Sequence, residues 1–525
     1  MNHPASASAR VKPPRMTDPS PPAERPLSTS HSALALAGAA LFLYLRTFLL
    51  PATPFIAHDD QTIFFARAVH ILHGQVLYRD FFEFVPPGTG LLYAAGFRIF
   101  GVHAWLLQAW SIALGLALFS VITLLARRIL HGALILLPGL LFLIFDYDVA
   151  MVPTHHWYST LAALAAVAAL ARRSTPWRIL SAGLLCGIAT LFTQTQGGLA
   201  FVALLLYLVW PIHSSKAPRL LLRISAFAVP YFLILLCVLG YYAYEAGART
   251  LFFDLVVFPL HYLSGDFNSP RAYLHQFPPL HSFAGILRLI PYLFIYALVP
   301  YIYFVGGYQL WRRRRDLGSS QLPLMLLHLT GTALVLAVAT GPRFYRLCTV
   351  APPSILVCVW LLRGPDTIRT LLRRSLVALA LFFALLLPIY RQTRHYLILD
   401  LPIGRTAFSD PEEFREFQRL AQRTRPGEPF FNHSGLSLYL SLENPAPIEF
   451  INNDDFTRPQ QVAAVIQALQ QHAPRYIALD PETSPPNPRD HSASFRQYVH
   501  QHYSLAETFA IDHNSRPEEI WELKP

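Results

Sequence analysis

Long apolar segments recur along the sequence and limit what the chain can fold into. A helical run of about 17–25 apolar residues is long enough to cross the hydrocarbon core of a bilayer. The rest of the composition agrees, since 53% of the 525 residues are hydrophobic and only 14% are charged. We therefore predict an α-helical polytopic membrane protein with about eleven transmembrane helices. The expected spans are 32–51, 104–126, 129–146, 156–172, 178–194, 197–213, 220–243, 284–309, 322–340, 346–362 and 373–390.

Basic residues fall in every second connection between these spans. Connections that stay in the cytoplasm carry an excess of Lys and Arg, so we place these connections and the N-terminus in the cytoplasm, as expected for a multi-pass protein of the cytoplasmic (inner) membrane. The net charge of +11 then reports topology, and we expect membrane lipids and no nucleic acid as partners. The basic groups are Arg127-Arg128, Arg172-Arg173 with Arg178, Lys216 with Arg219 and Arg223, Arg312 to Arg315, and Arg363 with Arg369, Arg373 and Arg374.

The chain divides into three blocks. Residues 1–31 are rich in Pro, Ser and Ala and predict a disordered cytoplasmic tail. Residues 32–390 form the membrane domain, with long outer loops at 52–103 and 244–283. Residues 391–525 alternate helical and strand-like stretches, which predicts a small extracytoplasmic α/β domain. Its expected helices are 411–422, 459–471 and 495–503, and its expected strands are 429–431, 448–451 and 475–480.

An acidic pair, Asp59 and Asp60, lies directly after the first span. We expect one helix at 61–72 after it and a second at 90–100. Carboxylates beside a bilayer are costly to keep, and one placed there could remove a proton from a hydroxyl while a lipid-borne group is transferred to that hydroxyl. Asp59 is our candidate base, and Asp60 would support it or help to hold a divalent metal ion. Alternatively, one of the two caps the helix that follows.

Three further groups could bind substrate at the outer ends of spans. Arg343 and Arg346 are three residues apart, and guanidinium groups suit a phosphate; they could instead extend to lipid headgroups. Gln194 could donate to the same phosphate or close a helical hairpin. His155 and His156 are adjacent, so they would diverge on a helix, and a substrate contact is favoured over a metal site shared with nearby aspartates.

The first outer loop resembles that of GT-C glycosyltransferases, specifically protein O-mannosyltransferases and the lipid A aminoarabinose transferase. The shared order is an acidic pair, an aromatic and Ala-rich helix, a glycine and a Tyr-Arg-Asp stretch, and two prolines before a second helix. In this chain these are Asp59-Asp60, Gly74, Tyr78-Arg79-Asp80-Phe81, Pro86-Pro87 and Phe100-Gly101. Two later stretches, Gly187 to Gly197 and Arg343-Phe344-Tyr345-Arg346 with Pro352-Pro353, also resemble family motifs, and they add Tyr345 to the expected substrate contacts.

Three positions depart from the family pattern. The acidic pair is Asp-Asp where the family usually has Asp-Glu, Thr193 replaces a lysine, and Arg346 stands where many members have histidine. The identity of the donor sugar and of the phosphate ligands is therefore open.

The resemblance implies transfer of a hexosyl or pentosyl group from a polyprenyl-phosphate carrier to a lipid, glycan or protein at the outer membrane face, with inversion or retention. Arg79 and Glu83 could line the acceptor entrance, or form an ordinary exposed pair. A transporter or flippase of lipid-linked sugars would predict charges deep in the spans and broken helices. A glycan polymerase or ligase would rely on Arg and His in a large outer loop, and a non-catalytic scaffold would lose nothing when Asp59 changes.

Overall fold

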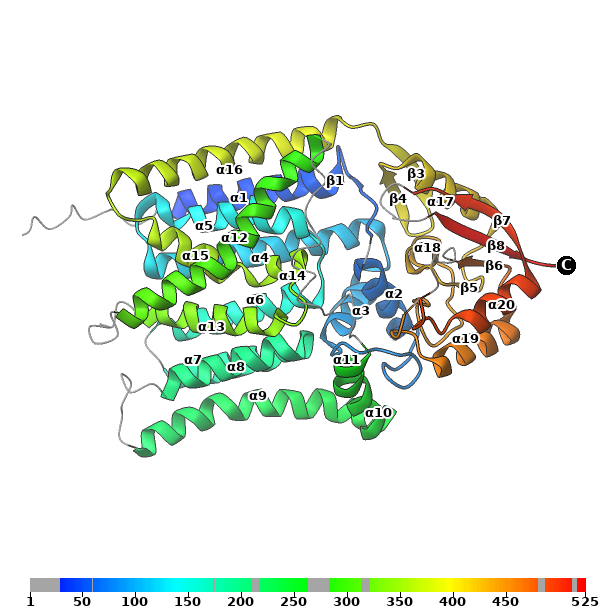
Figure 1. Cartoon of the computed structure of the whole chain (residues 1–525), viewed down its shortest axis with the longest axis horizontal. Helices are drawn as coiled ribbons and strands as arrows, with labels where there is room; N and C mark the ends of the chain where they lie inside the picture. Colours follow the sequence, from blue (N-terminus) through cyan, green and yellow to red (C-terminus); the bar gives the residue numbers. More distant parts are fainter. Residues whose placement is uncertain are drawn as a thin grey trace, which may run out of the picture.

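The computed structural model describes residues 29–58, 60–172, 175–209, 217–262, 283–312, 322–452, 454–479, 487–511 and 517–525. Most of the expected tail lies outside these ranges, and the first helix begins at Thr29, three residues before the expected start of the span. Figure 1 shows a helical bundle on one side, the strands of the C-terminal part on the other, and helices α2 and α3 between them. We call the end of the bundle beside α2 and α3 the α2 end, and the opposite end the far end.

The bundle is built from long apolar helices. Five segments of the described chain are long and apolar enough to cross a membrane, and a bent pair makes up to six. The count of eleven is thus not confirmed, because several expected spans form helices of only 16–17 residues, at or below the lower limit of about 17 for a helix that crosses a bilayer core. The bundle helices are α1 (Thr29–Thr47), α4 (Ala104–Ile129), α6 (His155–Leu170), α7 (Pro176–Phe192), α8 (Gln194–Val209), α9 (Ala217–Ala246), α12 (Phe283–Arg312), α13 (Leu322–Val338) and α16 (Thr367–Thr393).

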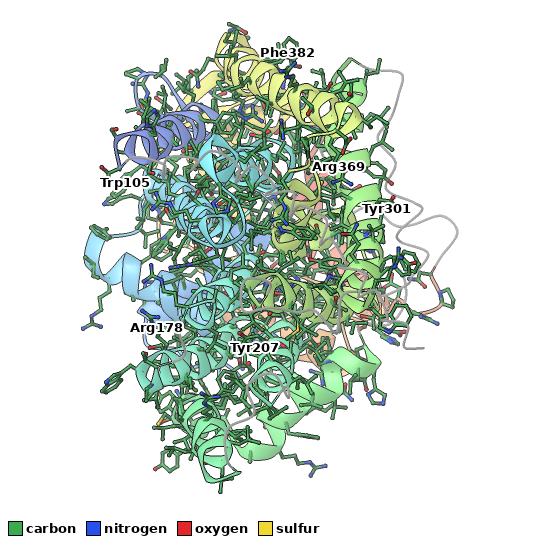
Figure 2. The ribbon with its side chains drawn as sticks, turned by 90° about the vertical axis from the view of Figure 1, so that its left-hand side faces the viewer. Trp105, Arg178, Tyr207, Tyr301, Arg369 and Phe382 are labelled. Carbon is green, nitrogen blue, oxygen red and sulfur yellow. The ribbon has the colours of Figure 1, made fainter. Side chains whose placement is uncertain are left out.

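Apolar side chains cover the rim of the bundle. Viewed end-on in Figure 2, Tyr301 of α12 and Phe382 of α16 project outward, and they are 65% and 56% exposed. In α9 and α16 only 11% of the most apolar window is buried inside the protein. Contiguous apolar surface on this scale marks contact with lipid or another protein, which fits a membrane protein.

Two of the expected spans are not continuous helices. The span at 129–146 breaks into η1 (Gly132–Ile135), α5 (Leu137–Leu141), a π-helical turn η2 (Phe142–Tyr147) and η3 (Asp148–Ala150). The span at 346–362 forms α14 (Phe344–Val350) and α15 (Pro352–Leu361), bent by 64°. Consecutive prolines begin α15, and proline supplies no backbone N–H to continue a preceding helix.

Short elements cover the α2 end. Both helices expected in the first loop are confirmed as α2 (Asp60–Leu72) and α3 (Gly88–Phe100). Strands β1 (Phe48–Leu49) and β2 (Thr53–Pro54) pair before them. In the second expected loop, the described residues form α10 (Ala248–Phe252), a π-helical turn η5 (Phe253–Val257) and α11 (Phe258–His261).

The C-terminal part combines a hairpin, a four-stranded sheet and four helices. In the sheet the order is β5-β6-β8-β7, with β5 and β6 parallel and the other pairs antiparallel. The strands are β3 (Leu397–Leu401) and β4 (Gly404–Phe408), which form the hairpin, then β5 (Phe430–Phe431), β6 (Tyr476–Leu479), β7 (Tyr503–Phe509) and β8 (Glu518–Leu523). The helices are α17 (Pro411–Arg423), α18 (Ser434–Tyr439), α19 (Pro459–His472) and α20 (Ala493–His502).

One strand prediction was wrong. Residues 448–451 are not a strand, although Ile448 and Ile451 are buried as a strand pattern would place them. Their backbone bonds to side chains instead: Asn444 donates to the carbonyl of Ile448, and the N–H of Ile451 donates to Asn432. Backbone groups that are satisfied in this way do not need a sheet partner.

Candidate functional site

The site begins at the first turn of α2. Asp60 is the first residue of this helix, and Asp59 lies outside the described residues. Phe64 and Arg67 follow Asp60 by four and seven residues, so the three share one helix face. The Arg67 guanidinium stands 5.5 Å from the centre of the Phe64 ring, and the Phe64 ring is 5.2 Å from that of His155. This face of α2 is therefore turned toward the start of α6.

The start of α6 brings its two histidines to α14. The rings of His155 and His156 are 4.0 Å apart, and that of His156 is 5.9 Å from the ring of Tyr345. Arg346 donates from Nε to the Tyr345 hydroxyl at 3.4 Å and from Nη1 to the carbonyl of Gly341 at 3.3 Å. The guanidinium is thereby fixed beside the tyrosine.

Charges link the three segments into one site. The Asp60 carboxylate interacts electrostatically with the Tyr345 phenol, as do Arg343 and Arg346. Arg346 also acts on both histidines. We call this group the mouth cluster, and it consists of Asp60, His155, His156, Tyr345 and Arg346.

Gln194 and Gln196 take different directions at the start of α8. The side chain of Gln194 donates to the carbonyl of Leu255 at 3.3 Å, so it joins α8 to η5 and does not reach the mouth cluster. Gln196, fully buried, interacts with His156 and lies 3.5 Å from the hydroxyl of Thr349. The sequence offered no signal that separates the two, because both lie in the same short polar stretch.

Glu83 and Arg79 occupy other surroundings. Glu83 is buried, pairs with Arg67, and accepts the N–H groups of Phe84 and Val85 at 2.9 and 3.0 Å. Burial raises the pKa of Glu83, although the Arg67 guanidinium opposes this. Arg79 is exposed, with ion pairs to Asp80 at 2.9 Å and Glu245 at 2.7 Å.

A second buried pair ties α2 to the C-terminal part. Nε2 of His70 lies 3.1 Å from a Glu449 oxygen. Burial alone would lower the pKa of His70, but the Glu449 carboxylate outweighs burial and raises it. Burial likewise would raise the pKa of Glu449, and His70 and Arg67 together lower it. Arg67 therefore lies between the mouth cluster and this pair.

Sequence reasoning missed Arg67, Gln196 and Glu449. A signal existed for Arg67, because a lone arginine seven residues after Asp60 in an apolar helix falls on the same face as the acidic group. No local pattern could have connected Glu449 with His70, since 379 positions separate them in the sequence.

A separate group in the C-terminal part has a spacing that could hold a metal ion. Ligand atoms of Glu416, His433 and Glu518 all lie within 4.8 Å of one another. However, Nδ1 of His433 accepts the N–H of Leu436 at 2.9 Å, which leaves the proton of a neutral ring on Nε2, 3.3 Å from Glu518. A protonated nitrogen cannot bind a metal.

Protonation accounts better for this group. Burial, and then the charge of Glu518, raise the pKa of Glu416 well above its usual range. The Glu416 carboxyl is fully buried, and neither oxygen has a hydrogen-bond partner among the described residues. We therefore interpret Glu416, His433 and Glu518 as a group that binds a proton. A divalent ion beside Asp60 stays a separate prediction.

Neither a protein-family model nor a curated protein matches the sequence. The fold, in contrast, is similar to those of solved membrane enzymes. ArnT from Cupriavidus metallidurans bound to undecaprenyl phosphate aligns with a TM-score of 0.56 and 14% identity over 94% of this chain and 98% of its own. The oligosaccharyltransferase AglB from Archaeoglobus fulgidus, in complex with an inhibitory peptide and a dolichol-phosphate, aligns with a TM-score of 0.53 and 10% identity over 93% of this chain and 74% of its own.

Arabinofuranosyltransferase AftD from Mycobacteria aligns with a TM-score of 0.50 and 13% identity over 95% of this chain, which covers 40% of that larger protein. All three are GT-C glycosyltransferases. The chain thus has the fold of membrane GT-C glycosyltransferases, and the resemblance predicted from its first loop is confirmed at that level. At sequence identities of 10–14%, these similarities establish the fold alone.

Proposed function

We propose that the protein is a membrane glycosyltransferase that moves a sugar from a polyprenyl-phosphate carrier to an acceptor at the outer face of the cytoplasmic membrane. The observation that carries this proposal is the mouth cluster. In it, three segments far apart in the sequence bring a carboxylate, two imidazoles, a phenol and a guanidinium together at the α2 end of a GT-C fold. Both ArnT and AglB were solved with a polyprenyl-type phosphate bound.

Each group has a role that its chemistry permits. The acceptor oxygen forms a bond to the anomeric carbon, and the bond from that carbon to the phosphate oxygen breaks, so the electron pair leaves with the polyprenyl phosphate. The acceptor proton passes to Asp59, with Asp60 supporting it or helping to hold a metal ion. Arg346 and Arg343 stabilise the negative charge that develops on the leaving phosphate.

Two cavities at the α2 end have room for an acceptor. A cavity of about 550 Å³ lies between α2 and the C-terminal part and is lined by His70, Glu449 and Asn444 among others. A smaller pocket of about 390 Å³ is lined by Arg79, Asp254 and Arg458. We propose the smaller pocket as an acceptor entrance, with Arg79 at its surface. Glu83 is buried with Arg67 and does not line this pocket.

The test is a transfer assay with the purified full chain. Radiolabelled polyprenyl-phosphate sugars serve as donors and a crude envelope extract as acceptor, with Asp59→Asn and Asp60→Asn compared against the unchanged protein. A general base contributes about 10²–10⁴-fold, so we expect Asp59→Asn to lose at least a hundredfold in rate while retaining its thermal unfolding profile. Arg369→Gln is the matched control, because Arg369 pairs with Asp366 on an exposed surface far from the cluster.

The outcomes distinguish the alternatives. Loss of transfer in Asp60→Asn alone would make Asp60 the base. Full transfer by both variants would move the base outside the acidic pair. Absence of transfer with every donor would reject the enzyme and leave a transporter, for which Asp146, buried within the broken segment 132–150, is a specific argument.

A further inference from the structure

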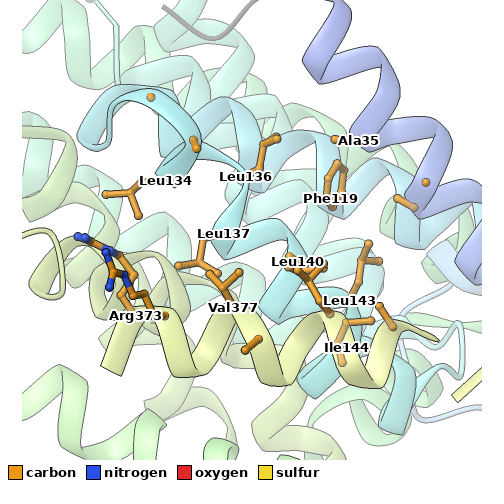
Figure 3. A pocket seen from close by; sticks show the side chains of 18 of the residues that line it. Ala35, Phe119, Leu134, Leu136, Leu137, Leu140, Leu143, Ile144, Arg373 and Val377 are labelled. Carbon is orange, nitrogen blue, oxygen red and sulfur yellow. The ribbon is translucent and has the colours of Figure 1, made fainter. Parts of the chain in front are cut away.

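A large cavity lies away from the mouth cluster. A cavity of about 1090 Å³ opens between α1, α16 and the broken segment 132–150. Figure 3 shows Ala35 of α1, Leu137 and Leu140 of α5, and Val377 of α16 around it. Its volume is at the upper end of the roughly 300–1,000 Å³ typical of sites for small molecules.

Small residues of α1 leave part of this space open. Ala35, Gly38 and Ala39 line the cavity together with Phe42, and a side chain added at Gly38 would meet nothing within 4 Å. Opposite them, α16 exposes Leu381 and Ala378. The cavity is thus a groove between two helices at the lipid-facing rim, and a long flexible chain could enter it from the side.

Charge is confined to one end of this groove. Figure 3 shows Arg373 at one end and Leu143 and Ile144 at the other. All the charged or titratable lining residues are basic, namely His131, Arg363, Arg373 and Arg374, and no carboxylate lines the cavity among the described residues. The nearby Asp366 is already paired with Arg369.

Two of the arginines are held in place by the protein. Arg373 donates from Nη1 to the carbonyl of Leu362 at 3.4 Å, and the Arg363 guanidinium stacks 4.5 Å from the ring of Trp360. A guanidinium has five N–H donors, and the bond to Leu362 uses one of those of Arg373. The groove therefore combines an apolar channel with fixed positive donors at its far-end mouth.

We propose that this groove binds an anionic phospholipid of the surrounding membrane, with the headgroup phosphate at Arg373 and Arg374 and an acyl chain among the leucines of α5 and α16. The far end is the one that the basic residues of the sequence predict to face the cytoplasm. Anionic lipids are enriched there, and basic clusters attract them. The site is at the opposite end from the mouth cluster, so the inference stands independently of the proposed transferase activity.

Native mass spectrometry of the purified protein tests the proposal. Phosphatidylglycerol and phosphatidylcholine with identical acyl chains are titrated separately, and glycerol phosphate is added as the headgroup without its chains. The variants are Arg373→Gln with Arg374→Gln, Ala378→Trp to fill the groove, and Arg312→Gln as the matched control. Arg312 lies at the same end, contacts Tyr308 and does not line the groove.

The expected pattern is specific. The unchanged protein should bind one phosphatidylglycerol more tightly than phosphatidylcholine by about 25-fold, from roughly fivefold for each of two arginines. The double variant should lose this preference, Ala378→Trp should weaken binding of both lipids, Arg312→Gln should change neither, and glycerol phosphate should not compete. The proposal would be overturned by equal binding of the two lipids to the unchanged protein, or by a preference that survives the double variant or falls equally in Arg312→Gln. Unchanged binding in Ala378→Trp, or competition by glycerol phosphate, would overturn it as well.

Discussion

The two ends of the helical bundle carry charge in opposite arrangements. At the α2 end, buried groups of both signs face one another, as in the pairs Arg67–Glu83 and His70–Glu449. At the far end, the arginines of the large groove have no carboxylate among the described lining residues. The first arrangement neutralises charge inside the protein, and the second leaves positive charge available at the membrane surface.

This difference in charge arrangement indicates what each end of the bundle can do. Buried charges of opposite sign are costly to separate, because each partner is desolvated. They therefore hold helices and side chains in one geometry, as a reaction centre requires. Arginines at a membrane surface keep most of their hydration, so they can exchange partners at little cost to the fold. The comparison predicts large effects of substitution at the α2 end and small effects on stability at the far end.

The largest effect is expected for Arg67→Met. This change leaves Glu83 buried without its cation, and breaking a buried pair costs about 3–5 kcal/mol. Because burial already raises the pKa of Glu83, the uncompensated carboxylate should take up a proton in mild acid, and the loss should shrink as the pH falls. Thermal unfolding of the purified protein between pH 5 and pH 8 measures both the loss of stability and its pH dependence. This range extends around the ordinary pKa values of carboxyl and imidazole groups.

The companion variant separates charge from packing. Arg67→Met with Glu83→Leu removes both charges, and most of the lost stability should return. If the double variant is as unstable as Arg67→Met alone, the pair contributes by packing and the proposed contrast between the two ends fails on this point.

Arg346→Gln is expected to affect catalysis more than the fold. Removing a group that stabilises transition-state charge costs about 10²–10³-fold in rate. Arg346→Lys should recover part of this loss, since it keeps the charge but not the fork of donors. Arg475→Gln is the control, because Arg475 pairs with Glu522 at the surface of the C-terminal part. Transfer rates close to those of the unchanged protein in Arg346→Gln would remove this arginine from the site.

Much of this end of the molecule could be predicted because its signals are local. Asp410-Pro411-Glu412-Glu413 has the composition of a helix start, and α17 begins there with Asp410 as its cap. The two helices of the first loop follow from apolar spacing and from the prolines between them. The residues that flank Asp60, His155 and Arg346 in the sequence predict a functional role for each of the three. The structure brings the three side chains together.

The remaining features have weak local signals or depend on contacts between distant residues. Hairpin β3–β4 joins residues 397–401 to 404–408, in a part of the chain that has the pattern of a connection between blocks. Within the apolar run 133–145, only Pro138 and Gly139 mark the break in the sequence. Glu83 follows Arg67 by 16 positions, beyond the reach of one helical repeat, and Glu449 lies in the C-terminal part, far from His70 in the sequence.

The His70–Glu449 pair should make docking of the C-terminal part dependent on pH. The pKa of His70 is raised above 6.5 in the folded protein, so its contribution is complete below pH 6.5 and is lost as the pH rises through the folded value. The pKa of Glu449 is lowered below 4.5, so its contribution is complete above pH 4.5 and is lost at more acid pH. Docking should therefore be tightest between these two values.

Hydrogen exchange across α2 and α18 measures this dependence. We expect protection to fall above pH 6.5 by an amount corresponding to roughly 1.5–3 kcal/mol, the range for a hydrogen bond to a charged group. In His70→Gln the decline above pH 6.5 should disappear, because the glutamine does not titrate. A decline of the same size in His70→Gln would assign the pH dependence to another group, such as the proton held near Glu416.

The smallest effect on stability is expected for Arg374→Gln at the far end. Arg374 lines the groove and forms no ion pair among the described residues, and the nearby Asp366 pairs with Arg369. In neutral detergent, Arg374→Gln should change the free energy of unfolding by no more than about 0.5 kcal/mol, as is usual for surface substitutions. In phosphatidylglycerol the same variant should unfold earlier than the unchanged protein, because a ligand that binds only the folded state stabilises it by an amount that grows with its affinity. A loss in neutral detergent as large as that of Arg67→Met would mean that this arginine neutralises a charge inside the protein, and the two ends would then work alike.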